Sequence, residues 1–182
     1  LILASSSPRR RVLLNQINVG FELREQSADE SRVTITNPVK KVKALAKIKS
    51  DATEIYEGEV VLTADTVVSK DGIIYEKPEN KEHAYEMIKE FSGATHHVHT
   101  ACLLRSLHKE KIIVSQTDVI FYDLSDEDIE SYLQTDDFSD KAGGYGIQSH
   151  GAVLVKEIQG DYNTVVGLPL AEVARALKKW QE

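Results

Sequence analysis

The order of apolar and polar positions along the chain predicts alternating strands and helices. The apolar run "LILA" predicts a short buried strand, and "PRRRVLLNQI" predicts a helix with Pro8 in its first turn, where a missing N–H costs nothing. "FELRE" alternates like a half-exposed strand. A second helix is expected after Asn37, a typical N-cap residue. Its apolar positions form one stripe between lysines: Val39, Val42, Leu45, Ala46 and Ile48.

The middle of the chain carries the strongest strand signals. "EVVLTADTVVSKDGIIYEKP" predicts a strand, a turn at "DG" and a second short strand. After a helix through "KEHAYEMIKEFSG", capped by Asn80, the runs "THHVHTACLLRS" and "KIIVSQTDVIFYDL" predict two long strands. Ser125 and Asp128 then indicate a capping box for a short acidic helix.

The last part of the chain combines a glycine-rich loop with one strand and one helix. The loop "TDDFSDKAGGYGIQSHG" precedes a strand at "AVLVKEI", a turn at "QGDYNTVVGLP" and an amphipathic helix at "LAEVARALKKW". Hairpins mixed with helices indicate an α/β fold with a mixed, partly antiparallel twisted sheet flanked by helices. The length predicts one domain over residues 1–182, of one or two lobes.

Composition and charge narrow the classes of function. With 22 Lys and Arg against 29 Asp and Glu, the net charge of −7 argues against a broad nucleic-acid surface, but a local basic cluster can still bind a small anion. No apolar run approaches the roughly 20 residues that a helix needs to cross a bilayer, which argues against insertion into a membrane. The lone Cys102 lies among apolar residues, which favours a buried structural thiol over a nucleophile. A single cysteine cannot form an internal disulfide, which favours a reducing compartment, the cytoplasm. The chain begins without Met, so we expect that a few residues precede Leu1.

The opening segment "SSSPRR" has the composition of a phosphate-binding loop. N–H groups at a helix N-terminus point outward unsatisfied, and the helix dipole favours an anion there. Ser5 and Ser7 add hydroxyl donors, and Arg9 and Arg10 add charged donors that suit phosphate oxygens. The chain has no G-x-x-x-x-G-K-[ST] pattern, so the segment is not a P-loop. The alternative is a capped helix with a basic first turn. Positive charge at a helix N-terminus opposes the helix dipole, however, and local conflicts of this kind are most common at functional sites, so a binding site is favoured.

Two further segments carry candidate polar groups. Asp65 interrupts the apolar strand "LTADTVVSK" and is therefore a candidate metal ligand or general base. The other interpretation is a carboxylate at the exposed end of the strand. Spacing alone leaves these two interpretations equal. In "YEKPENK", Lys77 precedes a proline that holds it extended, although a solvated lysine is the common case. Lys49 is one of several lysines on its helix, and nothing independent singles it out.

The glycine-rich loop offers a second binding element. In "DKAGGYGIQ", the glycines permit the backbone to approach a ligand, Tyr145 offers a ring, and Gln148 offers a donor and an acceptor for a base edge. A flexible surface loop is the alternative, which the Tyr, Ile and Gln beside the glycines disfavour. The three histidines of "THHVHT" fall on both faces of a strand, so they predict an exposed polar face and not a metal site.

Together these segments resemble the Maf family (septum formation Maf-like proteins). The matching motifs are "SSSPRR", "ADT", "EKP", "DKAGGYGIQ" and "VVGLP", in the family's order and over nearly the whole chain. The resemblance implies a nucleoside triphosphate pyrophosphatase that uses a divalent metal, Mg²⁺ or Mn²⁺. It also implies two lobes with a cleft, an architecture similar to inosine-triphosphate pyrophosphatases, and a homodimer. The loop "DKAGGYGIQ" is similar to that of the subgroup acting on dTTP and UTP, whereas Ser6 and Gly144 occupy positions where the family varies.

The resemblance also implies roles for individual residues. Asp65 matches the proposed general base, and positions tied to substrate choice are matched by Arg9, Thr66 and Gln148. Further matches line the phosphate and metal site: Ser5, Arg10, Glu30, Lys49 and Lys77. The expected catalytic residues are Asp65, Lys77 and Arg9, the expected metal ligands are Glu30 and Asp65, and the expected substrate-binding residues are Ser5, Ser7, Arg10, Lys49, Thr66 and Gln148.

The implied reaction is hydrolysis of dTTP or UTP to the monophosphate and pyrophosphate, with CTP and modified pyrimidine nucleotides as further candidates. We expect Asp65 to activate a water that attacks the α-phosphorus while basic residues surround the triphosphate. The alternative is a nucleotide-binding regulator of cell division, a class that the family's name suggests, in which catalysis is weak or secondary.

Overall fold

The structure, a computed structural model, describes residues 1–181. Every strand and helix expected from the sequence is present in the expected order, with two differences given below, and the short 3-10 turns (η) are additional. In chain order they are β1 (Ile2–Leu3), α1 (Pro8–Gln16), β2 (Glu22–Leu23), η1 (Glu30–Arg32), α2 (Pro38–Asp51), β3 (Val61–Lys70), β4 (Ile73–Tyr75), α3 (Lys81–Phe91), β5 (Thr95–Arg105), β6 (Glu110–Phe121), α4 (Asp126–Leu133), η2 (Ala142–Gly144), η3 (His150–Leu154), β7 (Val155–Gln159), α5 (Tyr162–Val166) and α6 (Leu170–Trp180).

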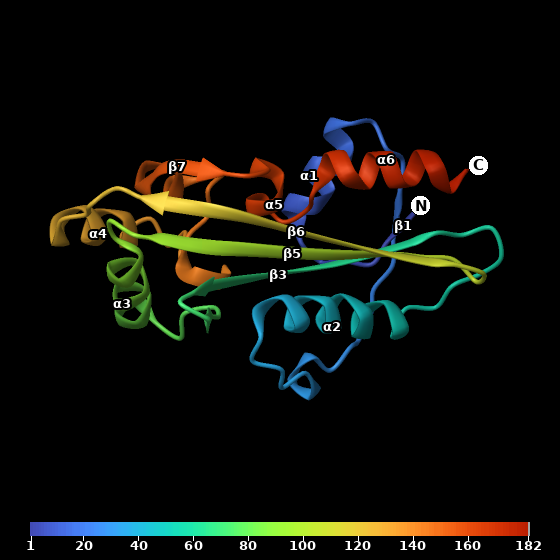
Figure 1. The fold of residues 1–182 in the computed structure, drawn as a ribbon, viewed down its shortest axis with the longest axis horizontal. Helices are drawn as coiled ribbons and strands as arrows, with labels where there is room; N and C mark the ends of the chain where they lie inside the picture. The colour runs from blue at the N-terminus through green and yellow to red at the C-terminus, as the bar shows by residue number, and fades with distance from the viewer. Residues whose placement is uncertain (182) are drawn as a thin grey trace.

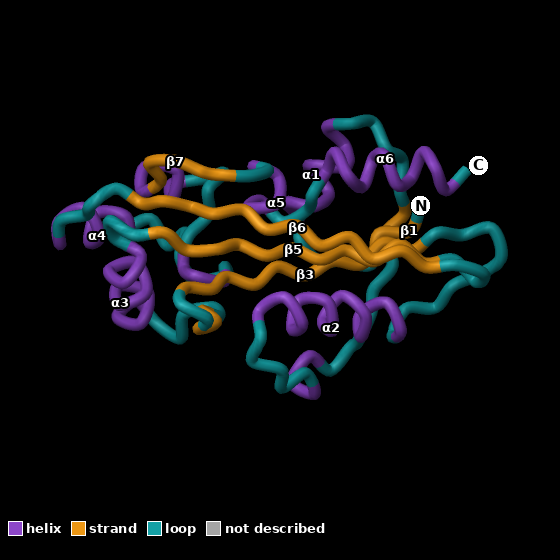
Figure 2. The backbone as a smooth tube through the Cα atoms, in the orientation of Figure 1, coloured by secondary structure: helices purple, strands orange, loops and turns teal. Residues whose placement is uncertain are grey.

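One mixed sheet runs the length of the molecule (Figure 1, Figure 2). Its strands lie in the order β2-β1-β3-β5-β6-β7, and β4 adds to β3 as the hairpin partner that "DG" predicts. β1 runs parallel to β2 and β3, whereas β3, β5, β6 and β7 pair antiparallel. The expected α/β fold with a partly antiparallel sheet is therefore confirmed.

Helices cover both faces of the sheet (Figure 1). α2 lies on one face, where Val42, Leu45 and Ala46 pack against side chains of β3 and β5. α1 and α6 lie on the opposite face and bury a second cluster around Leu14 and Val173. α3 and α4 close one end of the sheet over a third cluster of aromatic and aliphatic side chains. Among residues 1–181, no helix has the length and apolar character that crossing a membrane requires.

Two segments differ from the sequence expectation. "QGDYNTVVGLP", expected as a turn, contains the short helix α5, because the Asp161 carboxylate accepts a hydrogen bond from the Thr164 N–H at 2.7 Å and caps it. The expected strand "AVLVKEI" is shorter than predicted, because its first three residues end η3 and β7 begins only at Val155.

The exposed polar face expected for the histidines is wrong for two of them. His96 and His99 are buried, and their Nε2 atoms hydrogen-bond the Tyr145 hydroxyl at 2.6 Å and the Ser69 hydroxyl at 2.8 Å, respectively. Burial lowers the pKa of His96 to about 3, so its ring stays neutral in the core. His97 is partly exposed, and its Nδ1 pairs with the Asp118 carboxylate at 2.6 Å.

Cys102 is buried in the cluster beneath α1 and α6, as the sequence predicts. Burial raises the pKa of its thiol to about 12, so the thiolate that reacts with disulfide reagents is scarce at neutral pH. We expect the folded protein to resist labelling by an aromatic disulfide reagent, and the same protein in guanidinium chloride to react at one thiol per chain. Rapid labelling of the folded protein would contradict the packing around Cys102.

Candidate active site

The candidate site lies where one edge of β3 has no neighbouring strand. β1 pairs with β3 up to Leu62, and β4 pairs with β3 from Val68 onward. Between these pairings, the described residues place no strand beside residues 63–67 on this edge. Successive side chains of a strand point to opposite faces, yet Asp65 and Thr66 both border the space at this open edge.

A cavity of about 740 Å³ opens at this edge. It is bounded by the loop from β1 into α1, by η1 and α2, by the loop after β4, and by the glycine-rich loop. Every site residue that the sequence predicted borders it: Ser5, Ser7, Arg9, Arg10, Glu30, Lys49, Asp65, Thr66, Lys77 and Gln148. The structure thus brings together residues that lie far apart in the sequence, and their individual roles stay predictions.

Arg10 is the most deeply buried charge of the site, with 8% of its surface exposed. Its Nε donates to the Gly167 carbonyl at 2.7 Å, its Nη1 to the Ser5 hydroxyl at 3.1 Å and its Nη2 to the Thr66 hydroxyl at 3.3 Å. All three acceptors are neutral, and no ion pair joins Arg10 to the described carboxylates. Burial lowers the pKa of Arg10, and the negative charge of Asp65 acts in the opposite direction. A buried cation without an ion-pair partner is costly, so this position suits an anionic ligand.

The start of α1 is arranged to accept an anion beside Arg10. Ser7 is the N-cap residue, but its side chain does not cap the helix, so its hydroxyl does not satisfy the first N–H groups. The first turn holds Pro8 and Arg9 and has no acidic residue. N–H groups, hydroxyls and guanidinium groups therefore converge at this end of the cavity, as the sequence interpretation of "SSSPRR" expects.

Asp65 and Glu30 face one ammonium group. The Lys49 Nζ lies 2.6 Å from the Asp65 Oδ1 and 3.3 Å from the Glu30 Oε1, and it also lies 3.5 Å from the Ala64 carbonyl oxygen on the open edge of β3. Asp65 lies in the middle of β3 with 15% of its side chain exposed, which removes the interpretation as an exposed strand end. Lys49 is thereby distinguished from the other α2 lysines, which the sequence alone could not do.

These carboxylates fit a divalent metal of the kind that the sequence implies. Mg²⁺ and Mn²⁺ take oxygen ligands, and Mg²⁺ is commonly held by one or two carboxylates together with substrate phosphates and water. Asp65 and Glu30 supply two carboxylates that reach one ammonium group. Residues 1–181 contain no group of three or more His, Cys, Asp or Glu suited to a metal. The donor set therefore suits a metal that arrives with a phosphate ligand better than a permanently held ion.

Lys77 borders the cavity from the loop after β4 and is exposed. The neighbouring Glu76 pairs with Lys41 at 2.8 Å, and its carbonyl accepts a hydrogen bond from the Gly143 N–H at 3.2 Å. These contacts fix the backbone on which Lys77 stands. No described carboxylate pairs with Lys77, so its ammonium group is free to meet a ligand.

The glycine-rich loop forms the wall of the cavity that carries Gln148. The Gln148 side chain is exposed toward solvent and borders the cavity. Tyr145 borders the cavity, but it is 6% exposed and its ring packs against Phe91 and Phe121, so little of the ring is available to a ligand. Its buried hydroxyl bonds His96, so Tyr145 anchors the loop to the core.

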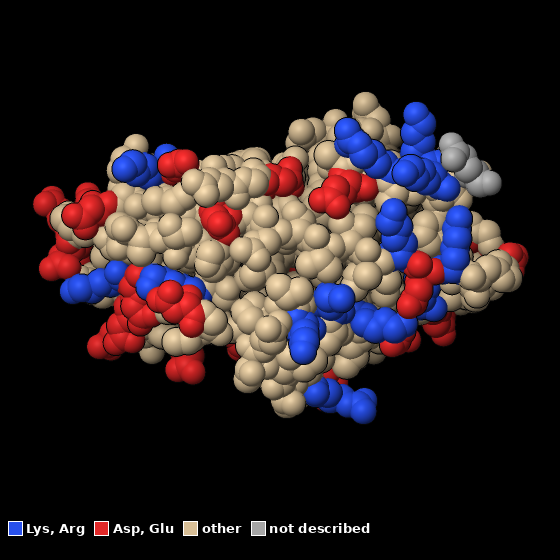
Figure 3. All heavy atoms as spheres, viewed as in Figure 1, with Lys and Arg blue, Asp and Glu red and all other residues tan. Residues whose placement is uncertain are grey.

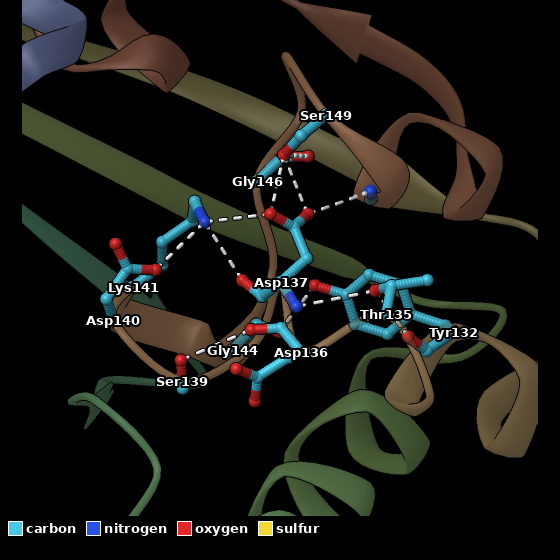
Figure 4. A network of polar contacts seen from close by, with 11 residues as sticks. Tyr132, Thr135, Asp136, Asp137, Ser139, Asp140, Lys141, Gly144, Gly146 and Ser149 are labelled. Atoms are coloured by element: carbon cyan, nitrogen blue, oxygen red, sulfur yellow. Dashed lines mark hydrogen bonds and ion pairs between the residues drawn. The ribbon is translucent and has the colours of Figure 1, made fainter.

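Asp137 and Lys141 also border the cavity. The sequence interpretation missed Asp137, and it gave no role to Lys141 although this residue belongs to "DKAGGYGIQ". Figure 4 shows the Asp137 carboxylate between the Lys141 ammonium group and the Ser149 hydroxyl. Burial raises the pKa of Asp137, but hydrogen bonds from Ser149 and Lys141 outweigh it and hold the pKa below its ordinary value. The two residues lie four positions apart in a segment of turns outside any helix, so no helical pairing pattern in the sequence indicates them.

Charged side chains on the surface are divided between the two ends of the molecule. On the face in Figure 3, acidic side chains gather at the end that α3 and α4 form, and basic side chains are more numerous near α2 and α6. Positive charge that could hold a small anion is instead local to the cavity, where Arg9, Arg10 and Lys77 converge.

The fold and the cavity define an α/β protein that gathers cationic groups and a carboxylate around one cavity. The chain belongs to the Maf family: residues 1–180 match the family described as Maf-like protein. A dTTP/UTP pyrophosphatase from Latilactobacillus sakei subsp. sakei is 43% identical over 180 residues, which cover 97% of this chain and 98% of that protein. Proteins of the same name from Bacillus cytotoxicus and Halalkalibacterium halodurans are each 44% identical over 98% of this chain and 94% of theirs.

Solved structures with the same fold are far more distant in sequence. The Ham1 protein of Staphylococcus aureus superposes with a TM-score of 0.56 at 10% identity, over 100% of this chain and 98% of that chain. A HAM1 protein from Coxiella burnetii gives 0.50 at 9% identity, over 98% of both chains. At such low identity the likeness concerns the fold alone.

Proposed function

We propose that this protein hydrolyses the bond between the α- and β-phosphates of dTTP and UTP, releasing the nucleoside monophosphate and pyrophosphate. The observation that carries the proposal is the buried Arg10 guanidinium, held by neutral acceptors in the same cavity as the Asp65 carboxylate. The near full-length similarity to proteins named dTTP/UTP pyrophosphatase supports the choice of substrate.

The triphosphate binds among the cationic groups at the start of α1. Arg9 and Arg10 approach it from the first turn of α1 and Lys77 from the loop after β4, and the N–H groups of that first turn add neutral donors. Phosphoryl transfer needs little covalent help from the protein, so positioning and electrostatic stabilisation provide most of the rate. The same cations stabilise the charge that develops on the departing pyrophosphate.

Asp65 acts as the general base. Its Oδ1 is held by the Lys49 ammonium group at 2.6 Å, and no hydrogen bond from the described residues reaches its Oδ2. One oxygen is thus fixed while the other is available to a water. The Oδ2 takes a proton from that water as its oxygen attacks the α-phosphorus, and the bond to the bridging oxygen of pyrophosphate breaks.

A divalent metal would be held by Asp65 and Glu30, and when bound it supplies charge neutralisation for the phosphate oxygens. Lys49 stands between the two carboxylates and keeps them from repelling each other before the substrate arrives. The base of the nucleotide lies toward the glycine-rich loop, where the Gln148 amide reads a pyrimidine edge. Thr66 supports the opposite wall through its hydrogen bonds to Arg10 and Thr100.

The proposal includes a cytoplasmic location and a homodimer. The buried thiol of Cys102 is compatible with a reducing compartment. Exposed apolar residues on β6, Ile112 and Val114, offer a surface that a second copy could cover. Sedimentation of the purified protein measures the oligomeric state directly.

The test is release of pyrophosphate from a panel of dTTP, UTP, CTP, GTP and ATP, each with Mg²⁺, with Mn²⁺ and with EDTA. We expect turnover of dTTP and UTP with metal, weak turnover of purine nucleotides, and loss of turnover in EDTA. Binding without turnover across the panel would favour the nucleotide-binding regulator instead. Equal turnover of dTTP and GTP would remove the claim of pyrimidine specificity.

Arg9 and Arg11, which lie on either side of Arg10 in the sequence, provide a matched pair of variants. Arg9 borders the cavity, whereas Arg11 does not, and the buried Nε of Arg11 has no hydrogen-bond partner among residues 1–181. We expect Arg9→Ala to lower kcat/KM by roughly 10²-fold, the effect of losing one charged contact to phosphate. Arg11→Ala should stay within about 3-fold of the unaltered protein. A larger loss in Arg11→Ala than in Arg9→Ala would invert this assignment.

A further inference from the structure

Asp137 joins two parts of the chain that flank Gln148. Its Oδ1 accepts hydrogen bonds from the Lys141 Nζ at 2.9 Å and the Ser149 Oγ at 2.8 Å. Its Oδ2 accepts from the same Ser149 Oγ at 2.7 Å and from the Gly151 N–H at 3.3 Å. One carboxylate thus holds donors from residues that precede and follow Gln148 in the chain, and Figure 4 shows Lys141 and Ser149 beside it.

The turn that carries Gln148 is tightly wound around this carboxylate. The Ser149 N–H donates to the Gly146 carbonyl at 3.2 Å, which closes a turn with Gln148 inside it. A Cβ on Gly151 would lie 2.5 Å from the Gly146 carbonyl oxygen, and a Cβ on Gly146 would lie 2.6 Å from the Lys141 Cε. The packing therefore leaves this turn little room to shift while the Asp137 contacts persist.

The turn is fixed at its other end as well. The Tyr132 hydroxyl of α4 donates to the Gly144 carbonyl at 2.8 Å, and the Tyr145 hydroxyl meets His96 in the core. Gln148 itself makes no hydrogen bond with the described residues and borders the cavity. The backbone turn therefore determines where the Gln148 side chain lies, because no hydrogen bond from the described residues holds that side chain.

We propose that Asp137 is a positioning residue that fixes residues 146–151, and through them the Gln148 amide, so that it sets the choice of nucleotide. This role rests on the proposed function, because it matters only if Gln148 reads the base. The Asp137 side chain is 10% exposed and its acceptor positions are occupied by Lys141, Ser149 and Gly151, so it is a support beneath the site and not a ligand of the substrate. Lys141 is likewise neutralised by Asp137 and Asp140, both at 2.9 Å, so it is not a free cation for phosphate.

The test compares Asp137→Asn with Asp136→Asn in the full chain. The amide in Asp137→Asn keeps the size of the side chain but presents an NH₂ group to the three donors, so the turn loses contacts on one side. Asp136 is exposed, its side chain makes no hydrogen bond with the described residues, and its positive φ of 59° suits asparagine. The control thus removes the same charge one residue away without touching the turn.

For Asp137→Asn we expect KM for dTTP to rise by about 10-fold with kcat changed by less than about 3-fold, which matches the loss of one or two hydrogen bonds. The ratio of kcat/KM for dTTP to that for GTP should fall by a similar factor. Asp136→Asn should match the unaltered protein in both. Unchanged selectivity in Asp137→Asn, or an equal fall of kcat for every nucleotide, would overturn the proposal.

Backbone amide hydrogen exchange separates this inference from the proposed function. Without any nucleotide, residues 146–151 should exchange faster in Asp137→Asn than in Asp136→Asn, while β5 exchanges at the same rate in both. If the unaltered protein hydrolyses no nucleotide, the proposed function fails while the exchange result still decides whether Asp137 fixes the turn. If Asp137→Asn does not fold, Ser149→Ala removes one donor from the same carboxylate and should shift KM and exchange in the same direction by a smaller factor; no shift in either would also overturn the proposal.

Discussion

Replacing Asp65 by asparagine is expected to abolish most of the hydrolysis of dTTP while leaving the nucleotide able to bind. Asparagine retains the shape and one acceptor oxygen, but it cannot take the proton of the attacking water. A general base contributes about 10²–10⁴-fold in rate, so we expect kcat to fall by that factor. Single-turnover hydrolysis of labelled dTTP, with binding measured by calorimetry in the same buffer, gives both quantities.

The ion pair with Lys49 requires a control for structure in this experiment. Asp65→Asn removes one of the two carboxylates beside the Lys49 ammonium group and leaves Glu30 at 3.3 Å. Thermal unfolding of Asp65→Asn should therefore stay close to that of the unaltered protein. An Asp65→Asn protein that binds UTP and hydrolyses it at the rate of the unaltered protein would contradict the assignment of Asp65 as the general base.

Arg10→Met is expected to cost nucleotide affinity far more than stability. Methionine fills much of the space of the buried side chain and removes a cation that has no ion-pair partner, which offsets the loss of its hydrogen bonds to neutral acceptors. Losing a buried charged contact to an anion costs about 2–5 kcal/mol, so we expect kcat/KM for dTTP to fall by roughly 30- to 5,000-fold. The free energy of unfolding in urea should change by less than about 2 kcal/mol.

Arg175→Met is the matched control, because Arg175 is exposed on α6 and donates only to the Ala171 carbonyl of its own helix. It should change neither activity nor stability measurably. If Arg10→Met unfolded at room temperature while Arg175→Met did not, Arg10 would be a structural residue and not a phosphate ligand. Near-normal affinity in a folded Arg10→Met would equally contradict the phosphate role.

Local signals in the sequence predicted most of the elements because they are strong and short in range. Asn37, Asn80 and Ser125 each accept a backbone hydrogen bond at the start of α2, α3 and α4, as their positions before apolar periodic segments indicate. The helix α5 was missed because Asp161 and Asn163 are equally common in turns, and five residues are too few to show a period.

The two arginines of "SSSPRR" show what the sequence cannot decide about the site. Arg9 and Arg10 are adjacent and chemically identical, but a helix turns each residue by about 100° relative to the next. α1 thus directs Arg10 into the protein, against Gly167, and leaves Arg9 at the cavity. Since "PRRRVLLNQ" has no regular apolar stripe, its rotation follows from packing against α6 and the sheet.

Long-range contacts explain the residues that sequence reasoning missed. Asp137 meets Ser149 and Gly151, which lie 12 and 14 positions further along the chain, and no local pattern links them. Tyr145 follows two glycines in a segment typical of a surface loop. It is nevertheless buried, because Phe91 of α3 and Phe121 of β6 pack against its ring. Such contacts depend on how the loop folds back over the sheet.

The open edge of β3 has a consequence for self-association. Unpaired N–H and C=O groups on a strand can recruit a strand from another chain, and proteins commonly protect such edges with charged side chains. Here the Lys49 ammonium group lies 3.5 Å from the Ala64 carbonyl oxygen, and Asp65 places a charge at the centre of the same stretch. The groups that would carry out the chemistry therefore also keep this stretch of β3 from pairing with a foreign strand.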